Sequence, residues 1–130
     1  MVVHGDFSIE AGAGALPRLL DRREPPTAVF CFSDEMAMGL IEAARERGVR
    51  VPRDLSVIGF DDIQGAAYST PSLTTVRQPL AHMGRLAAQT LLARIEGEKD
   101  SSPEILIEPE LVVRKSTAEA PKLPTARSRD

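Results

Sequence analysis

Two short apolar runs that flank a segment of helical periodicity constrain the fold of this chain more than any other feature. Residues 27–32 (TAVFCF) and 55–60 (LSVIGF) are largely apolar and rich in residues that favour strands. Between them, residues 35–47 repeat apolar side chains at helical spacing and place charged side chains on the opposite side. The order strand, helix, strand predicts a parallel sheet flanked by helices, with both strands covered on both faces.

The ends of this central helix carry the expected capping residues, and weaker patterns extend the prediction in both directions. Ser33 and Asp34 are suitable N-cap residues, and Gly48 stands where a helix C-terminal glycine is common. Further elements are expected as a strand end at Val2–Val3, a helix over 8–22, an extended piece over 74–76, a helix from Pro79 to Gly97, and two extended pieces within 105–114. We expect one partial domain over residues 1–117 and a disordered tail over 118–130.

Composition narrows the class of protein. The 130 residues suit one domain, and 42% hydrophobic residues with no Trp and one Tyr predict an aliphatic core. A net charge of −3 argues against binding to nucleic acid or an anionic membrane by this chain alone. We predict a soluble cytoplasmic protein, because the sequence has a single cysteine, no apolar run of membrane length and no secretion signal at its start.

Acidic and polar side chains follow three of the expected strands. Asp6, the pair Ser33-Asp34 and the pair Asp61-Asp62 would all lie at carboxyl ends of strands, where open parallel sheets bind ligands. Carboxylates there can accept hydrogen bonds from the vicinal hydroxyls of a sugar. Structural roles compete with this interpretation, since Asp34 is favoured as a helix cap and one of the Asp61-Asp62 pair can fix the loop through backbone N–H groups.

The sequence gives less support for catalysis or for a metal site. Clustered acids suit Mg²⁺ in phosphoryl transfer, but the few lysines lie in expected surface or tail positions. The histidines and the cysteine have no metal-ligand spacing, and "GAGA" over 12–15 lacks the third glycine of a dinucleotide loop. No nucleophile with a base and an orienting group is evident. We therefore predict no enzyme activity, catalytic residue, metal site or cofactor.

Three stretches together resemble one protein family. They are "PPTAVFCFSDEMAMGLIEAARERGVRVPRDLSVIGFDD", "PSLTTVRQPLAHMGRLAAQTLLARIEGE" and "ILIEPELVVRKST". They look like the C-terminal half of the LacI/GalR transcriptional regulators, over about residues 5–117. The resemblance implies a type I periplasmic-binding-protein-like sensor, in which two α/β lobes close on a sugar or nucleoside-like effector. This chain would supply the C-terminal lobe and a remnant of the N-terminal lobe.

The resemblance also implies an effector site. Asp61 matches an aspartate that binds effector hydroxyls, and Phe7 matches an aromatic residue that packs against the effector ring. Ser33 matches a position often held by Asn, so a single hydroxyl group replaces an amide. Gln78 lies in the crossover segment that lines the cleft, with a solvent-exposed hinge residue as the alternative.

The chain also departs from the family pattern. A helix-turn-helix, a hinge helix and most of the N-terminal lobe are not represented in these 130 residues. The resemblance therefore implies a sensing fragment that does not contact DNA alone, that binds a sugar weakly if at all, and that forms a homodimer. Two surfaces are candidates for the dimer contact: helices such as 34–48, and the apolar face of helix 80–95, which lacks its usual partner. The sequence leaves the geometry open, since helix 80–95 can also dock on its own lobe or exchange with a neighbour. A stand-alone protein that binds a small ligand or a partner is the alternative, and a Mg²⁺-dependent phosphotransfer domain is a remote one.

Overall fold

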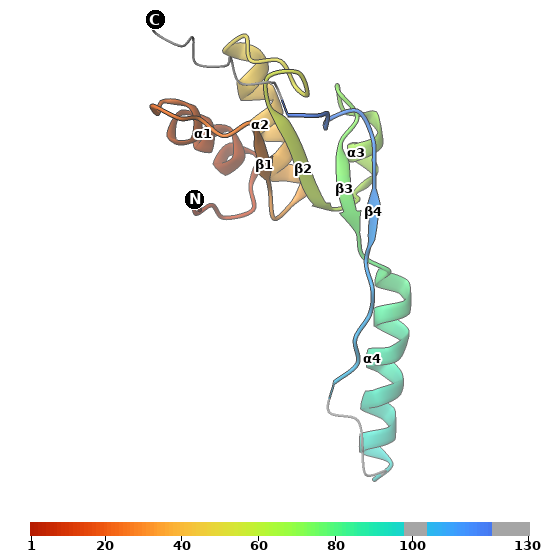
Figure 1. Ribbon diagram of the computed structural model, residues 1–130. Coiled ribbons are helices and arrows are strands. Elements are labelled where there is room, and N and C mark those ends of the chain that lie inside the picture. The colour runs from red at the N-terminus through yellow and green to blue at the C-terminus, as the bar shows by residue number, and fades with distance from the viewer. Residues whose placement is uncertain (98–103, 121–130) are drawn as a thin grey trace, which may run out of the picture.

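A computed structural model describes residues 1–97 and 104–120 of the chain (Figure 1). Four helices and four strands alternate along most of the described chain. In chain order they are α1 (Ile9–Leu20), β1 (Ala28–Phe30), α2 (Asp34–Glu46), β2 (Ser56–Asp61), α3 (Gln64–Tyr68), β3 (Thr74–Arg77), α4 (Leu80–Ile95) and β4 (Glu110–Val112).

The strands form one mixed, mostly parallel sheet in the order β1-β2-β3-β4. β1 and β3 both pair with β2 in parallel, and β4 adds to β3 in the antiparallel direction. The α/β class and the parallel sheet flanked by helices are therefore confirmed. Because β1, β2 and β3 are parallel, their carboxyl ends meet at one edge of the sheet, and each leads into a loop or helix there.

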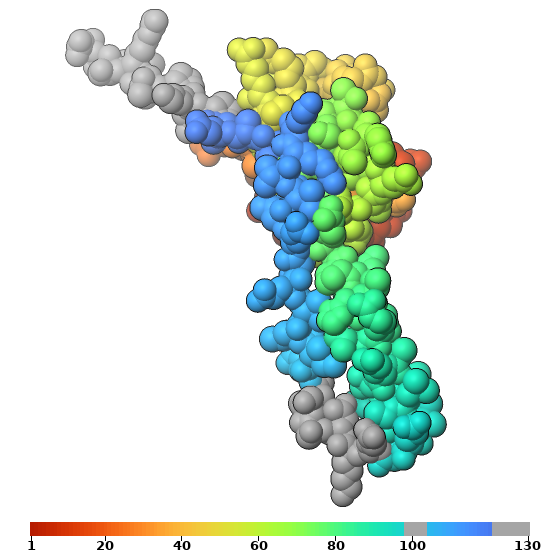
Figure 2. Space-filling view, turned by 90° about the vertical axis from the view of Figure 1, so that its right-hand side faces the viewer, coloured from red at the N-terminus to blue at the C-terminus, as the bar shows by residue number. Residues whose placement is uncertain are grey.

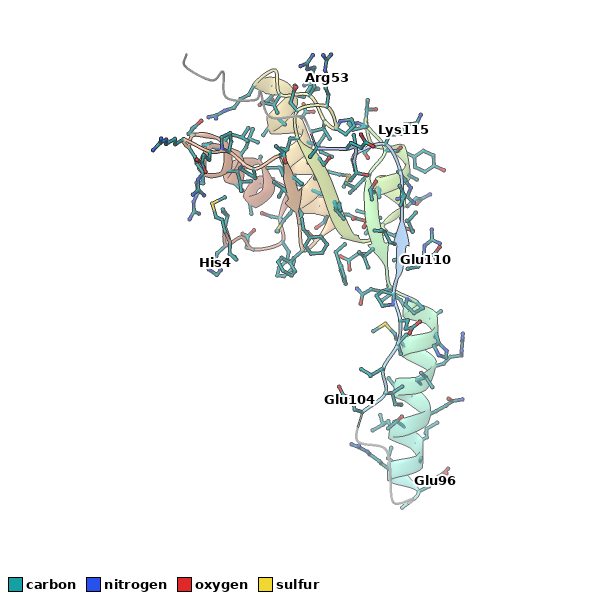
Figure 3. The ribbon with its side chains drawn as sticks, in the orientation of Figure 1. His4, Arg53, Glu96, Glu104, Glu110 and Lys115 are labelled. Atoms are coloured by element: carbon teal, nitrogen blue, oxygen red, sulfur yellow. The ribbon has the colours of Figure 1, made fainter. Side chains whose placement is uncertain are left out.

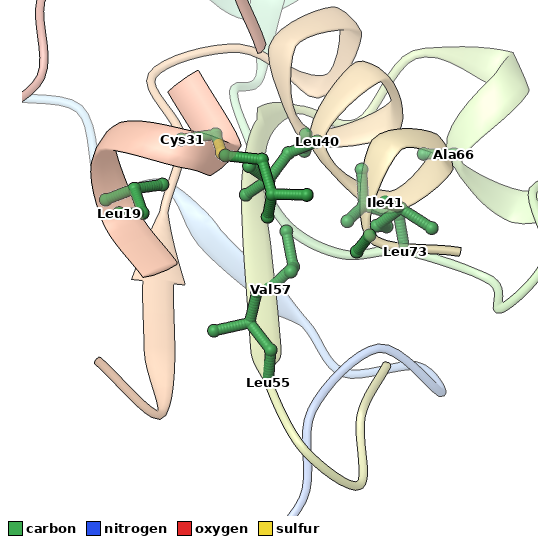
Figure 4. Close-up of a cluster of buried hydrophobic side chains, with 11 residues drawn as sticks. Leu19, Cys31, Leu40, Ile41, Leu55, Val57, Ala66 and Leu73 are labelled. Atoms are coloured by element: carbon green, nitrogen blue, oxygen red, sulfur yellow. The ribbon is translucent and has the colours of Figure 1, made fainter. Parts of the chain in front are cut away.

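One aliphatic core lies between the sheet and the helices α1, α2 and α3 (Figure 4). Alternate residues of β2 point to this side, so Leu55 and Val57 are fully buried and Gly59 faces α2. Leu40 and Ile41 pack from α2 onto the same cluster. The members of the core are Leu16, Leu19, Cys31, Ala37, Leu40, Ile41, Ala44, Leu55, Val57, Ala66 and Leu73.

Local sequence explains where the two core helices begin. The hydroxyl of Ser8 accepts a hydrogen bond from the N–H of Ala11 at 3.0 Å, and that of Ser33 accepts one from Met36 at 3.1 Å. Each serine thus satisfies an N–H group that the first turn of a helix leaves without a partner. At the end of α2, Gly48 takes a positive φ of 72°, as the sequence predicts for a helix C-terminus.

The opposite face of the sheet is open, which contradicts the expectation that the strands are covered on both faces. Phe30 and Phe32 are 46% and 64% exposed, and Phe30 contacts Phe60 edge-on with ring centroids 6.4 Å apart. Leu111 and Val113 extend the same apolar surface across β4. The sequence could not reveal this, because a continuous apolar run shows that both faces are apolar but not that both are covered.

Ser116 joins the C-terminal segment to the amino ends of β2 and β3. Its hydroxyl donates to the carbonyl of Val57 at 2.6 Å and accepts from the N–H of Thr74 at 2.8 Å. Ser116 thus links the two strands just before their first paired residues, Ile58 and Thr74, and it is fully buried. Ala118 exchanges hydrogen bonds with the Ser56 hydroxyl, and the rest of the predicted tail from residue 121 lies outside the described residues.

Helix α4 and residues 104–109 project from the sheet as an arm and run side by side (Figures 1 and 2). Glu110 lies near the junction, whereas Glu96 and Glu104 lie farther along the arm (Figure 3). No residue of α4 is buried, and Leu80, Leu91 and Ile95 are each at least 60% exposed. The predicted helix and its uncovered apolar side chains are therefore confirmed.

Three details differ from the sequence-based expectations. Val2 and Val3 form no strand, and α3 appears within a stretch expected to be irregular. The described part of the region 105–114 contains the single strand β4 instead of two extended pieces. None of the described helices is both long and apolar enough to cross a membrane.

Candidate functional site

The carboxyl-end edge of the sheet holds all of the described non-glycine residues with positive φ. Phe7 has φ 69°, Asp61 has φ 113° and Asp62 has φ 55°. Such angles are costly for residues with a side chain, and they concentrate where a backbone is held for function. All four predicted effector-binding residues lie at this edge or directly beside it, since Ser33 follows β1, Asp61 ends β2, Gln78 follows β3 and Phe7 precedes α1.

Asp61 and Gln78 are in direct contact. The side-chain amide nitrogen of Gln78 donates to Oδ1 of Asp61 at 2.8 Å, and both side chains are partly exposed. This hydrogen bond orients the carboxylate and leaves Oδ2 of Asp61 without a described hydrogen bond from the protein. The pair therefore presents a carboxylate acceptor together with an amide carbonyl at the rim of the sheet, a combination that suits ligand hydroxyl groups.

Asp62 has a different role, because two arginines bind its carboxylate. Nε of Arg77 contacts Oδ2 at 2.6 Å, and Nη2 of Arg114 contacts Oδ1 at 2.6 Å. Burial alone would raise the pKa of Asp62, but the hydrogen bonds from Arg114 and Arg77 outweigh it and lower the pKa below its usual value. Arg77 also contacts Glu110, so this network ties the loop after β2 to β3 and β4.

The prediction that one of the two acids fixes the loop therefore applies to Asp62, although its partners are side chains and not backbone N–H groups. Arg77 and Arg114 were not singled out from the sequence. Arg77 stands beside Gln78 in the "TTVRQP" stretch, but Arg114 lies 52 residues from Asp62 and only the fold brings the two together.

Asp34 is a fully buried anchor at the first turn of α2. Its carboxylate accepts from the hydroxyl of Thr75 and from the N–H of Ile63 at 2.8 Å. Burial raises the pKa of Asp34, the hydrogen bonds from Thr75 and Ile63 lower it, and the nearby charges of Asp61 and Asp62 raise it further, so that the net direction is upward. The side chain thus links α2, β3 and the loop after Asp62, and it is a structural residue.

Gly59 makes room for this anchor. A Cβ atom at Gly59 would lie 2.2 Å from Oδ1 of Asp34 and 2.9 Å from a methyl carbon of Leu73. The glycine in "VIGFDD" is therefore required by the close approach of Asp34 to β2.

Phe7 and Ser33 meet at the other end of the same edge. The hydroxyl of Ser33 donates to the carbonyl of Phe7 at 3.3 Å while it caps α2, so that its donor is already used. Phe7 as a whole is 59% exposed. Asp6 holds the turn before it by accepting from the N–H and hydroxyl of Ser8, and these hydrogen bonds lower the pKa of Asp6.

The predicted site residues thus form two contacting pairs along one edge, Phe7 with Ser33 and Asp61 with Gln78. A cavity of about 370 Å³ lies elsewhere, between the N-terminal residues, α1 and β1, and its lining does not include Asp61 or Gln78. Within residues 1–97 and 104–120, no group of three or more His, Cys, Asp and Glu side chains is arranged to hold a metal ion.

The chain is similar to known proteins over most of its length. Residues 2–117 match the model of the periplasmic binding protein-like domain. Over 120 residues the chain is 47% identical to the HTH-type transcriptional repressor PurR of Proteus mirabilis. The aligned residues are 92% of this chain and 35% of the repressor. The chain therefore spans about a third of the length of the curated relatives it matches.

Two solved structures with bound sugars share the fold. The complex of the transcriptional regulator CelR with cellobiose is 40% identical with a TM-score of 0.80, over 86% of this chain and 34% of that one. A LacI family transcriptional regulator from Enterococcus faecium with bound ribose is 36% identical with a TM-score of 0.76, over 87% of this chain and 41% of that one. Together with the family match over residues 2–117, these similarities show that the chain belongs to the periplasmic-binding-protein-like domain family and corresponds to part of the effector-binding region of LacI/GalR-type transcriptional regulators.

Proposed function

We propose that this chain is the sensing part of a LacI-type transcriptional regulator, and that the Asp61–Gln78 pair binds hydroxyl groups of a sugar or nucleoside-like effector. The observation that carries the proposal is the position of Asp61, which ends a central parallel strand with φ 113° and keeps its carboxylate oriented by Gln78. Relatives that bind cellobiose and ribose support a polyhydroxylated ligand.

In this proposal the site residues divide into contacting and supporting groups. Asp61 and Gln78 contact ligand hydroxyls, and the exposed Phe7 ring packs against the ligand's apolar face. The Ser33 hydroxyl supports Phe7 by donating a hydrogen bond to the Phe7 carbonyl. Asp34 and Asp62 hold the loop that carries Asp61.

The described edge provides one wall of a binding site. Sugar sites enclose most of the ligand, so the isolated chain is expected to bind monosaccharides weakly or not at all. The function is non-enzymatic, and its place is the cytoplasm, where a repressor such as the PurR relatives meets DNA. The chain alone makes no DNA contact in this proposal, consistent with its net charge of −3.

A Mg²⁺-dependent phosphotransfer function has less support. Arginines engage both oxygens of Asp62, and Thr75 and Ile63 engage Asp34, so neither acid is left to hold a metal. A stand-alone partner-binding function draws its support from the open apolar face around Phe30 and Phe32.

A chimeric repressor tests the proposal. The matched 120 residues of the Proteus mirabilis PurR are replaced by this chain, and binding of a panel of sugars and nucleosides is measured by calorimetry. For any panel ligand that binds, Asp61→Asn is expected to weaken binding at least about tenfold, because one charged hydrogen-bond acceptor is lost. Asp54→Asn, which alters an exposed ion pair with Arg50, is the matched control.

Equal affinity of the Asp61→Asn and Asp54→Asn chimeras would contradict the assignment of Asp61. Sub-micromolar binding of a sugar by the isolated 130-residue chain would contradict the one-wall site.

A further inference from the structure

Two consecutive residues at the end of β2 hold an uncommon backbone conformation. Asp61 has φ 113° and Asp62 has φ 55°, although neither is a glycine. Such angles persist only where the surrounding structure holds the backbone in place. The contacts that hold this turn therefore decide where the Asp61 carboxylate points.

The Asp62 side chain anchors the turn, and its two arginine partners differ in burial. Nε of Arg77 and Nη2 of Arg114 each lie 2.6 Å from one oxygen of this mostly buried carboxylate. The Arg77 side chain is 47% exposed and also contacts the exposed carboxylate of Glu110, whereas the Arg114 side chain is 17% exposed. Because water screens exposed ion pairs, Arg114 is the stronger of the two partners. The pKa of Asp62 agrees with this order, because burial raises it and the hydrogen bond from Arg114 opposes burial more than the one from Arg77 does.

Arg114 is itself held where β3 begins. Its Nη1 donates to the carbonyl of Leu73 at 2.8 Å, and its backbone N–H donates to the hydroxyl of Thr74 at 2.9 Å. The guanidinium is planar and its donors form a fixed fork, so one head group binds Leu73 and Asp62 at a set separation. The Asp62 carboxylate is thereby placed relative to β3, the strand that leads to Gln78.

The segment over residues 114–118 is anchored to two strands. The N–H of Lys115 donates to the carbonyl of Ser72 at 2.9 Å, just before β3 begins. The buried hydroxyl of Ser116 bonds to both β2 and β3. This segment cannot move along the sheet without breaking several hydrogen bonds, so it provides a fixed base for the guanidinium.

We propose that Arg114 is a positioning residue of the effector site, which acts through Asp62 and does not touch the ligand. With Asp62 held by the guanidinium, the preceding residue Asp61 keeps the backbone angle at which its Oδ1 accepts from Gln78 and its Oδ2 is left for ligand hydroxyls. The inference rests on the proposed function of the Asp61–Gln78 pair, and it adds the residue that keeps this pair in contact.

Measurements on the ligand-free chain test the positioning directly. In the isotope-labelled 130-residue chain, the three-bond coupling between the amide and Hα protons of Asp61 reports its φ, and the side-chain amide resonances of Gln78 report the hydrogen bond to Asp61. Arg114→Gln removes the charge and the fork, so it is expected to move the Asp61 coupling toward that of an ordinary strand residue and to shift the Gln78 amide. Arg50→Gln, which breaks an exposed ion pair with Asp54, is the matched control and is expected to change neither.

A ribose titration of the same proteins tests the consequence for the site. Ribose is the probe because a LacI family regulator of similar fold has it bound. The initial slope of the Asp61 amide shift against ribose concentration is expected to fall at least about tenfold in Arg114→Gln, to fall about threefold or less in Arg77→Gln, and to stay the same in Arg50→Gln. Arg114→Lys keeps the charge without the planar fork, so its slope should lie between those of Arg114→Gln and the unaltered chain.

A double substitution separates positioning from a merely structural role. Urea unfolding measures the stability of each variant, and the titrations are made where every variant is folded. If Arg114 acts on the site only through Asp62, Arg114→Gln adds no further loss of ribose response to Asp62→Asn. It still lowers the stability further, because the carbonyl of Leu73 also loses its donor. Should Arg114→Gln fail to fold, the same comparison is made with Arg114→Lys.

Two results would overturn the proposal. One is an unchanged Asp61 coupling and ribose response in folded Arg114→Gln, and the other is independent, additive losses of ribose response from Arg114→Gln and Asp62→Asn in the double variant. Absence of a ribose response at Asp61 and Gln78 in the unaltered chain would instead contradict the proposed function, and the ligand-free Asp61 coupling would still decide whether Arg114 sets this turn.

Discussion

Replacing Gly59 with alanine tests whether the buried Asp34 anchor holds the site loop in place. The added Cβ would lie 2.2 Å from Oδ1 of Asp34, well inside the 3.0 Å below which something must shift. Leu73 can move its methyl group, but Asp34 cannot retreat easily, because it stands in the first turn of α2 and its oxygens are bound by Thr75 and Ile63. The clash is therefore expected to break at least one of these hydrogen bonds.

The magnitude follows from three contributions. Overpacking a core costs about 1–3 kcal/mol, and loss of a buried hydrogen bond to a charged group costs about 1.5–3 kcal/mol. The lower backbone entropy of alanine in the unfolded chain offsets about 0.4–1 kcal/mol. We expect Gly59→Ala to lower the free energy of unfolding by about 3 kcal/mol.

Urea unfolding followed by far-UV circular dichroism measures this change through the transition midpoint, provided that the slope is unaltered. Gly14→Ala is the matched control: a Cβ there meets nothing within 4 Å, and alanine in an exposed helix position stabilises by about 0.5–1 kcal/mol. A Gly59→Ala protein within about 0.5 kcal/mol of the unaltered chain would refute the reasoning, because it would show that Asp34 is not tightly held.

Four further predictions concern Asp61, Asp62, Cys31 and helix α4. Asp61→Ala is expected to change the free energy of unfolding by less than about 1 kcal/mol. Asp61→Gly relieves the φ of 113° and is expected to be more stable than the alanine variant by about 1 kcal/mol. Urea unfolding measures both, and a loss above about 3 kcal/mol for Asp61→Ala would show that Asp61 is a structural acceptor. Because the folded-state pKa of Asp62 is lowered, its ionised carboxylate contributes its full stabilisation above the ordinary pKa of 3.8, and this contribution is lost as the pH falls below that value. Asp62→Asn should therefore make the free energy of unfolding depend less steeply on pH in the acid range, and an unchanged dependence would contradict this. Burial, and secondarily the charge of Asp34, raise the pKa of the Cys31 thiol to about 12. Iodoacetamide should therefore modify the folded chain very slowly near neutral pH and rapidly in urea, and equal rates would show that Cys31 is accessible. The exposed apolar side chains of α4 should drive self-association. Light scattering at micromolar concentration should therefore give the mass of a dimer, above the 14.1 kDa of one chain, and a mass of 14.1 kDa would show that α4 needs no partner.

The sequence predicted those parts of the fold that depend on neighbouring residues. Helical spacing over 35–47 and the flanking apolar runs predicted α2 between β1 and β2, because periodicity reports which side chains are buried. Ser33 and Gly48 predicted the ends of that helix through local backbone chemistry. The five-residue α3 was missed because it is too short to show a period.

Long-range contacts at the site could not be read in the same way. Asp61 and Gln78 were each selected from the resemblance, but their hydrogen bond joins residues 17 positions apart and depends on the parallel pairing of β2 with β3. The partner of Asp62 at Arg114 is still more distant in sequence. The open face around Phe30 was also unpredictable, since burial of a strand depends on what other elements cover it.

The central claim is that the edge formed by Phe7, Asp61 and Gln78 is a wall of a site for polyhydroxylated ligands. A titration of the isotope-labelled chain with ribose, followed through backbone and side-chain amide resonances, tests it most directly. We predict weak, progressive shifts at Asp61, at the Gln78 side-chain amide that donates to it, and at Phe7, and we predict their loss in Asp61→Asn. Shifts confined to the cavity beside β1 or to α4, or identical shifts in Asp61→Asn, would contradict this assignment.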